Sequence, residues 1–136
     1  MQTLASIDVL EVDLNHILLI DDDLKQLWLR EAVLNAAGFK VARAASAESA
    51  LALLRSRPAA GQPDAIITDH LLPGASGAQF VMELRGIHPH VPVFVLTGLS
   101  GAETEYDGLN VTFLEKPCAP EHLIRLLREA LAGQPA

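Results

Sequence analysis

The chain has 136 residues, half of them apolar, with a formal net charge of −7 and a single cysteine. A chain of this length can bury a sufficient core as one domain, and one cysteine excludes both an internal disulfide and a zinc site built on cysteine pairs. The negative charge and the scattered basic residues argue against direct binding to nucleic acid or to anionic membranes.

Short apolar runs alternate with amphipathic segments along the chain. The runs are too short for helices and predict strands, whereas the segments between them have helical periodicity and helix-ending signals. In chain order we expect strand 17–20, helix 24–37, strand 39–43, helix 47–57, strand 65–68, helix 78–88, strand 91–96, a weak helix 101–106, strand 111–114 and helix 120–131. The stretch 39–43 alternates apolar and basic residues, which is typical of an edge strand or of a strand with one wet face.

Five strand-helix alternations predict a single doubly wound α/β domain, with a parallel sheet and helices on both faces. The fourth helix should be short or irregular, because glycines crowd its segment. We expect an N-terminal extension at 1–15, the domain at 16–132 and a tail at 133–136, with no attached output domain. No apolar run is long enough to span a membrane and no secretory signal begins the chain, so a cytoplasmic protein is expected.

Polar residues stand where four of these strands end. In doubly wound sheets, ligands bind at the carboxyl ends of the strands. The residues at these ends are Asp21, Asp22, Asp23, Asp69, Thr97 and Lys116. Clustered carboxylates need a cation among them, and a set of oxygen ligands favours Mg²⁺. An aspartate beside Mg²⁺, a hydroxyl and an ammonium group can accept a phosphoryl group, while Asp23 is expected to cap the first helix.

These motifs resemble the receiver domains of bacterial two-component response regulators of the chemotaxis-regulator type. ILLIDDD is similar to their first strand and acidic pair, and Asp69 with Pro73 and Gly77 is similar to their phosphoacceptor strand and loop. VFVLTG and FLEKP are similar to the segments that supply the conserved hydroxyl and lysine of the family. The resemblance covers about residues 16–132 and implies a flavodoxin-like sheet with strand order 2-1-3-4-5.

The resemblance also implies the role of each site residue. Asp69 would be phosphorylated by a sensor histidine kinase or a phosphotransfer protein, and Lys116 would be joined to Pro117 by a cis peptide bond. The implied Mg²⁺ ligands are Asp22, Asp69, the backbone carbonyl of Leu71 and, through water, Asp21. The implied contacts to the phosphoryl oxygens are Thr97 and Lys116, and the implied switch residues are Thr97 and Phe113.

Such a domain is a signalling module rather than an enzyme, because it catalyses only its own phosphorylation and a slow autodephosphorylation. The apolar side chains of Leu71 and Leu99 are consistent with slow hydrolysis of the phosphorylated aspartate, since they cannot orient an attacking water. The module would switch a surface for a downstream protein partner. We also expect the segment around 98–110 to be mobile before phosphorylation, and Trp28 to pack in the core with Leu24 and Leu27.

Two alternatives remain open from the sequence. In a haloacid-dehalogenase-like phosphatase, Asp21 would be the nucleophile and Asp23 the acid/base, but Leu24 stands where that family has Thr or Val and Asp69 would have no role. In the second alternative, the chain is the terminal receiver of a hybrid sensor kinase.

Overall fold

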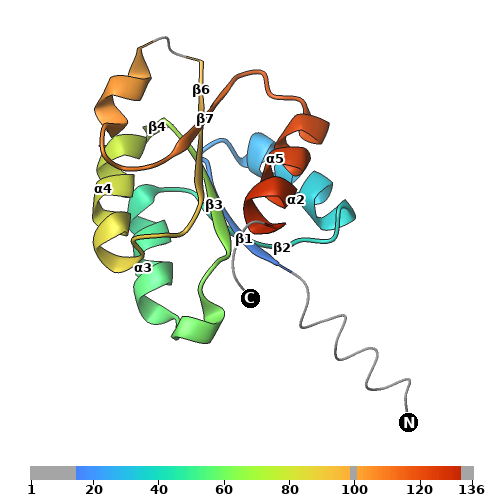
Figure 1. Cartoon of the computed structure of the whole chain (residues 1–136), viewed down its shortest axis with the longest axis horizontal. Helices are drawn as coiled ribbons and strands as arrows, with labels where there is room; N and C mark the ends of the chain where they lie inside the picture. Colours follow the sequence, from blue (N-terminus) through green and yellow to red (C-terminus); the bar gives the residue numbers. More distant parts are fainter. Residues whose placement is uncertain (1–14, 99–100, 133–136) are drawn as a thin grey trace.

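The computed structural model describes residues 15–98 and 101–132. These residues form a parallel sheet of five strands with helices on both faces (Figure 1). The strands are β1 (His16–Ile20), β2 (Lys40–Ala44), β3 (Ala65–Asp69), β6 (Val93–Thr97) and β7 (Thr112–Glu115). Their order in the sheet is β2-β1-β3-β6-β7, which confirms the predicted order 2-1-3-4-5.

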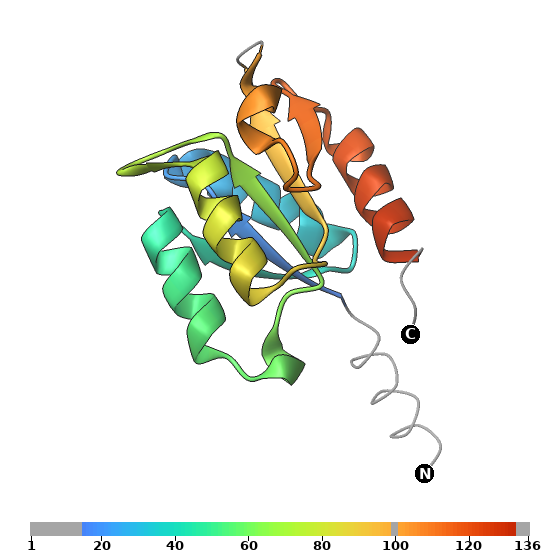
Figure 2. The ribbon, with the colours of Figure 1, turned by 60° about the vertical axis from the view of Figure 1, so that its left-hand side comes forward.

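The helices form two layers, as Figure 2 shows from a second direction. Helices α2 (Leu24–Ala36) and α5 (Pro120–Ala132) cover one face of the sheet. Helices α3 (Ala47–Ser56) and α4 (Gly77–Ile87) cover the other. The predicted weak helix is a five-residue 3-10 helix, η2 (Ala102–Tyr106), so the expectation of a short or irregular element is confirmed.

Two small elements were not predicted. A 3-10 turn, η1 (Ala59–Gly61), follows α3, and a hairpin of β4 (Leu71–Leu72) and β5 (Ala75–Ser76) follows β3. The hairpin turn contains Gly74 at φ 74°, a conformation that L side chains rarely adopt. Strands of two residues are too short to show a period in the sequence.

The helix starts agree with the capping signals. An Asp23 side-chain oxygen accepts hydrogen bonds from two amides in the first turn of α2, so its predicted role as the N-cap is confirmed. Ser46 begins α3 and Ser76 begins α4, each in a capping box. Strand β6 begins two residues later than predicted: Val91 is buried but precedes Pro92, which has no N–H for the ladder.

Both faces of the central strands are buried, which is why these strands are continuous apolar runs. In β1, Leu18 and Ile20 pack toward α3 and α4, and Ile17 and Leu19 pack toward α2 and α5. Strand β2 lies at an edge of the sheet, as its alternating pattern predicts. This two-sided core fixes the positions of the strand ends that carry the polar residues.

The prediction that Trp28 packs in the core was wrong. Its side chain is 66% exposed, and Leu24 and Leu29 on the same helix are 61% and 62% exposed. The buried stripe of α2 runs through Leu27 and Leu34, which are seven residues apart. Trp28 follows Leu27 by one position, and one residue turns the side chain by about 100° around the helix, out of the interface.

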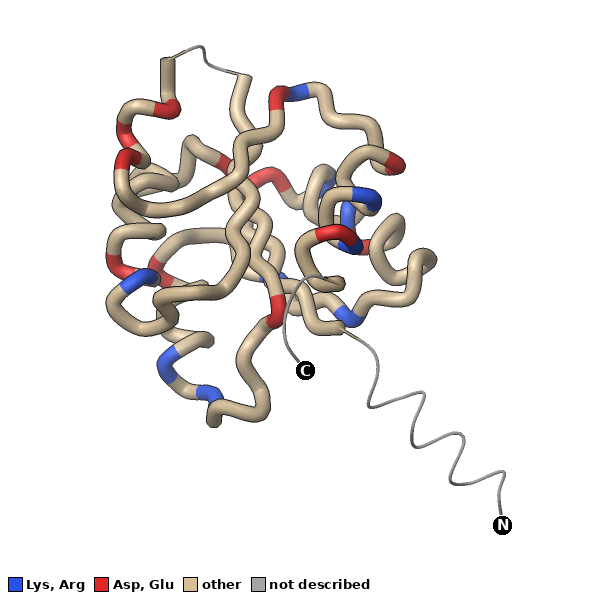
Figure 3. The backbone as a smooth tube through the Cα atoms, in the orientation of Figure 1, with Lys and Arg blue, Asp and Glu red and all other residues tan. Residues whose placement is uncertain are grey.

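The basic residues of the described chain lie on separate elements, as Figure 3 shows. In the described part of the chain, no helix is long and apolar enough to cross a membrane.

Candidate functional site

The carboxyl ends of the strands bring the predicted polar residues to one rim of the sheet. Asp69 is the last residue of β3 and is paired in register with Leu96, next to Thr97 at the end of β6. Thr97 is paired with Glu115 of β7, and the Lys116 amide donates a 3.0 Å hydrogen bond to the Thr97 carbonyl. Residues far apart in the chain therefore meet because parallel strands end at the same edge.

Three carboxylates form the centre of this rim. Asp21, Asp22 and Asp69 each offer an oxygen that lies within 4.8 Å of the other two. Asp21 and Asp69 are buried, at 2% and 5% exposure, whereas Asp22 is exposed. Such a group is electrostatically unfavourable unless cations compensate it.

Two protein cations lie against the cluster. The Arg30 guanidinium Nη1 is 2.5 Å from Asp21 Oδ2, and the Lys116 ammonium Nζ is 2.7 Å from Asp69 Oδ1. The Asp23 amide donates a further hydrogen bond of 2.9 Å to Asp21 Oδ1. Both Asp21 oxygens are thus engaged within the protein.

These contacts shift the pKa values of the two buried carboxyls, Asp21 and Asp69, in opposite directions. Burial alone would raise the pKa of Asp21, but hydrogen bonds with Asp69, the Asp23 amide and Arg30 outweigh it and hold that pKa below its usual value. Burial raises the pKa of Asp69 to about 6, the neighbouring Asp21 adds to this, and Lys116 opposes it. At neutral pH Asp69 is mainly ionised, as a nucleophile must be.

The predicted switch residues lie on β6 and β7, the two strands that η2 separates in the chain. Thr97 is buried, and Phe113 is half-buried in β7. The Phe113 ring packs edge-on against Tyr106 of η2, with centroids 5.1 Å apart. The Lys116-Pro117 peptide bond is cis, which confirms that prediction.

The sequence interpretation missed a buried pair beside Asp69. His70 is 4% exposed, and its Nδ1 lies 2.7 Å from the hydroxyl of Tyr106, which is 3% exposed. The His70 Nε2 also lies 3.5 Å from a Glu105 carboxylate oxygen. Burial and, to a lesser extent, Glu105 raise the pKa of the Tyr106 phenol, so the hydroxyl stays protonated.

Gly77 makes room for this pair. A β-carbon at Gly77 would lie 2.8 Å from the Asp69 carbonyl oxygen and closer still to the Tyr106 hydroxyl. The Gly77 amide also donates a 2.7 Å hydrogen bond to the His70 carbonyl. The glycine thus permits the start of α4, the end of β3 and η2 to pack together.

Signals for these missed residues exist in the sequence. Arg30 follows Asp23 by seven residues, which places it two turns along the same face of α2. Tyr106 is the one aromatic residue between Thr97 and Phe113. Ala102 and Tyr106 of η2 are buried, while the mobility of the segment before phosphorylation stays a prediction.

Leu71 is the first residue of β4 and follows Asp69 by two positions. It is 64% exposed. Its partner in the prediction of slow dephosphorylation, Leu99, lies outside the described residues, as do 1–14 of the predicted extension and the tail 133–136.

Comparison with known proteins identifies the family. The model of the response regulator receiver domain matches residues 17–128. The chain belongs to this family. Receiver domains are signalling modules of two-component systems rather than classical enzymes, and they generally bind Mg²⁺ at an acidic pocket.

Curated relatives are longer than this receiver. It is 29% identical over 119 residues to the transcriptional regulatory protein ZraR of Salmonella typhimurium, covering 85% of this chain and 26% of that protein. It is 30% identical over 122 residues to the hydrogenase transcriptional regulatory protein HoxA of Cupriavidus necator, covering 87% and 24%. The chain therefore spans about a quarter of the length of these relatives.

Solved structures match nearly end to end. A putative response regulator from Chloroflexus aurantiacus is 32% identical with a TM-score of 0.78, and the match covers 88% of this receiver and 99% of that chain. The chemotaxis response regulator CheY4 of Vibrio cholerae is 28% identical with a TM-score of 0.77, covering 87% and 99%. These matches agree with the predicted fold and family.

The donor set of the rim fits a hard divalent cation. Its three carboxylates provide only oxygen ligands, and Mg²⁺ binds few protein oxygens and completes its shell with water. The exposed side of Asp22 leaves the cluster open to that water.

The phosphatase alternative loses its support at the same site. Asp21 is buried with both oxygens engaged, and Asp23 caps α2 rather than standing free as an acid/base. The family match decides for the receiver.

Proposed function

We propose that residues 16–132 are a phosphoacceptor receiver in which Asp69 takes a phosphoryl group from a kinase or phosphotransfer-protein phosphohistidine, with Mg²⁺ bound at Asp21, Asp22 and Asp69. The observation that carries the proposal is the position of Asp69: it is buried at the end of β3, 2.7 Å from the Lys116 ammonium and within 4.8 Å of two other carboxylates.

The chain's own groups suit an in-line transfer. An ionised Asp69 oxygen attacks phosphorus, the phosphorus–nitrogen bond breaks, and the histidine nitrogen leaves with the electron pair. Lys116 and the Thr97 hydroxyl hold the phosphoryl oxygens, and the backbone carbonyl of Leu71 is a further metal ligand in this proposal. Bound Mg²⁺ supplies the remaining neutralisation of phosphoryl charge.

The phosphorylated form of Asp69 is long-lived in this proposal. An attacking water needs a polar group to orient it, and the exposed side chain of Leu71 offers none. Autodephosphorylation is therefore slow in the absence of a partner.

Signal output runs through Phe113 and η2 in this proposal. Thr97 moves toward the phosphoryl group, and Phe113 follows into the space that Thr97 leaves. Phe113 packs on Tyr106, which is bonded to His70 next to Asp69. The aromatic contact and the hydrogen bond couple the acceptor loop to η2, so phosphorylation alters the η2–β7 surface that a downstream protein reads.

In this proposal the phosphoryl donor docks on the exposed face of α2, next to the carboxylates at the strand ends. Leu24, Trp28 and Leu29 are exposed near the start of this helix, and exposed apolar clusters are typical of protein-protein contacts. A cytoplasmic kinase domain or phosphotransfer protein fits this face. A receiver of a hybrid sensor kinase would use it in the same way, and a signal receiver domain of a histidine kinase from Syntrophus aciditrophicus has the same fold with a TM-score of 0.77.

The direct test is phosphosite mapping after exposure to acetyl phosphate and Mg²⁺. We expect label on Asp69, no label in the Asp69→Asn variant, and strong loss with EDTA. Label on Asp21, or equal labelling of Asp69→Asn, would contradict the proposal. Glu83→Gln, an exposed carboxyl on α4, is the matched control and should label normally.

A further inference from the structure

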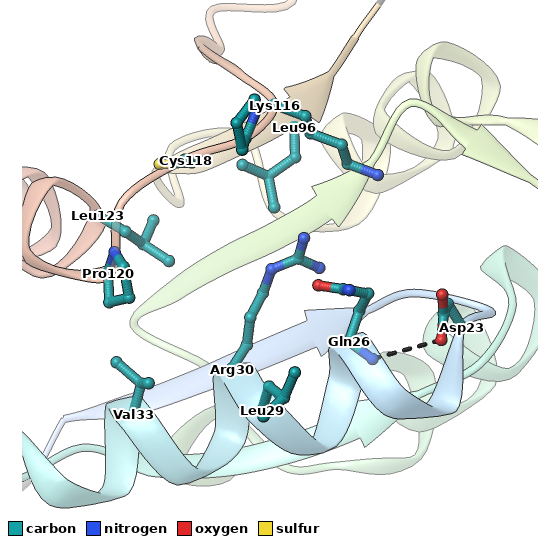
Figure 4. Close-up of a pocket in the computed structure, with 11 residues that line it drawn as sticks. Asp23, Gln26, Leu29, Arg30, Val33, Leu96, Lys116, Cys118, Pro120 and Leu123 are labelled. Carbon is teal, nitrogen blue, oxygen red and sulfur yellow. Dashed lines mark hydrogen bonds between the residues drawn. The ribbon is translucent and has the colours of Figure 1, made fainter.

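Arg30 is a charged residue beside the acidic rim with no role in the chemistry above. It projects from the middle of α2 toward the space near Lys116 (Figure 4). Its side chain is 19% exposed and lies against Asp21, whose side chain is 2% exposed. A hydrogen bond between charged groups is stronger than one between neutral groups, and a partly buried ion pair is screened less by salt than a surface pair.

The charges of the rim are nearly balanced without a metal. Asp21 is paired with Arg30 and Asp69 with Lys116, and the third carboxylate, Asp22, is exposed to water. Arg30 thus supplies to Asp21 the positive charge that a bound cation would otherwise supply.

A metal ion would have to share Asp21 with this guanidinium. One Asp21 oxygen accepts from the Asp23 amide and the other from Arg30. A divalent cation, or one of its waters, needs lone pairs of the same carboxylate and is repelled by a neighbouring positive charge. From this geometry we propose that Arg30 is an internal counter-ion that competes with Mg²⁺ for Asp21 and lowers the metal affinity of the receiver.

A cavity next to Arg30 can hold its guanidinium in a second position. This cavity of about 670 Å³ lies between α2 and α5, and Arg30 is among the residues that line it (Figure 4). Its lining includes Gln26, Leu29, Arg30, Val33, Lys116 and Pro120. Because Arg30 already lines this cavity, its long side chain can turn the guanidinium into it, so metal binding exchanges one position of Arg30 for another without unfolding α2.

This inference rests on the proposed Mg²⁺ site, and calorimetric titration of MgCl₂ into unphosphorylated protein tests it. We expect Arg30→Gln to bind Mg²⁺ with a dissociation constant about tenfold lower than that of wild type. Arg30→Lys keeps the charge and should stay within about threefold of wild type. Arg55→Gln is the matched control, because Arg55 pairs with Glu83 on the other face of the sheet, and it should bind as wild type does.

A second measurement separates competition from a purely structural role. The thermal midpoint of metal-free Arg30→Gln should fall, because Asp21 loses its counter-ion, and saturating Mg²⁺ should raise it by more than in wild type. Unchanged or weaker Mg²⁺ binding by a folded Arg30→Gln protein would overturn the inference while leaving the metal site intact. Absence of Mg²⁺ binding by wild type and every variant would overturn the proposed metal site itself, and the inference with it.

Discussion

Replacing Asp69 with Asn should stabilise the metal-free domain at neutral pH. The folded protein holds this carboxyl at a pKa of about 6, against an ordinary value of 3.8, because burial and the nearby Asp21 disfavour its charge. A difference of about 2 pKa units, at about 1.36 kcal/mol each, makes the ionised form cost the fold about 3 kcal/mol. Asn is uncharged, has nearly the same shape and retains an N–H for Asp21.

The sign of the pH dependence follows from the raised pKa. Well below pH 3.8, Asp69 is protonated in both the folded and the unfolded chain, so its ionisation costs wild type no stability relative to the variant. As pH rises from about 4 to about 6, the unfolded chain releases the proton first and wild type loses stability. The advantage of Asp69→Asn should therefore be small at pH 4 and complete near pH 7.5.

Urea unfolding in EDTA at pH 4.0 and pH 7.5, followed by far-UV circular dichroism, measures this difference. Glu83→Gln, which removes an exposed carboxyl, is the control and should show no comparable gain at either pH. Equal stability of Asp69→Asn and wild type at pH 7.5, or an equal advantage at both pH values, would refute the reasoning.

Three further substitutions test the local packing. Asp23→Ala removes the cap of α2 and should lower the free energy of unfolding by about 1 kcal/mol in urea titrations. Tyr106→Phe leaves the buried His70 Nδ1 without its partner and should cost about 1 to 2 kcal/mol, with faster amide exchange in η2. Gly77→Ala should lower the free energy of unfolding by more than either of these. Adding Tyr106→Phe to Gly77→Ala should recover only part of that loss, because the close contact with the Asp69 carbonyl remains. Complete recovery would contradict the clash with the backbone.

The fold and the central site residues were predictable because their signals are local. Apolar runs of strand length, separated by capped helical segments, indicate a doubly wound sheet, and such a sheet brings its strand ends to one edge. Asp21, Asp69, Thr97 and Lys116 each stand at such an end. The meeting of these residues at one rim therefore needed no knowledge of packing.

Other features depended on how the elements pack. The exposure of Trp28 depends on the rotation of α2 against the sheet, and an apolar pattern with Leu24, Leu27 and Leu29 leaves that rotation undefined. The two-residue strands β4 and β5 exist only because they pair with each other. In such cases the sequence allows several arrangements of similar local energy, and the core selects one of them.

The order of the elements and the chemical types at the strand ends follow from the amino-acid sequence, because chain periodicity and turn residues act over a few positions. Which charges compensate one another depends instead on how the elements pack. Arg30 meets Asp21 because α2 turns one face to the rim, and His70 meets Tyr106 across 36 residues. Pair contacts of this kind depend on side-chain direction and burial depth, which are properties of the packed molecule.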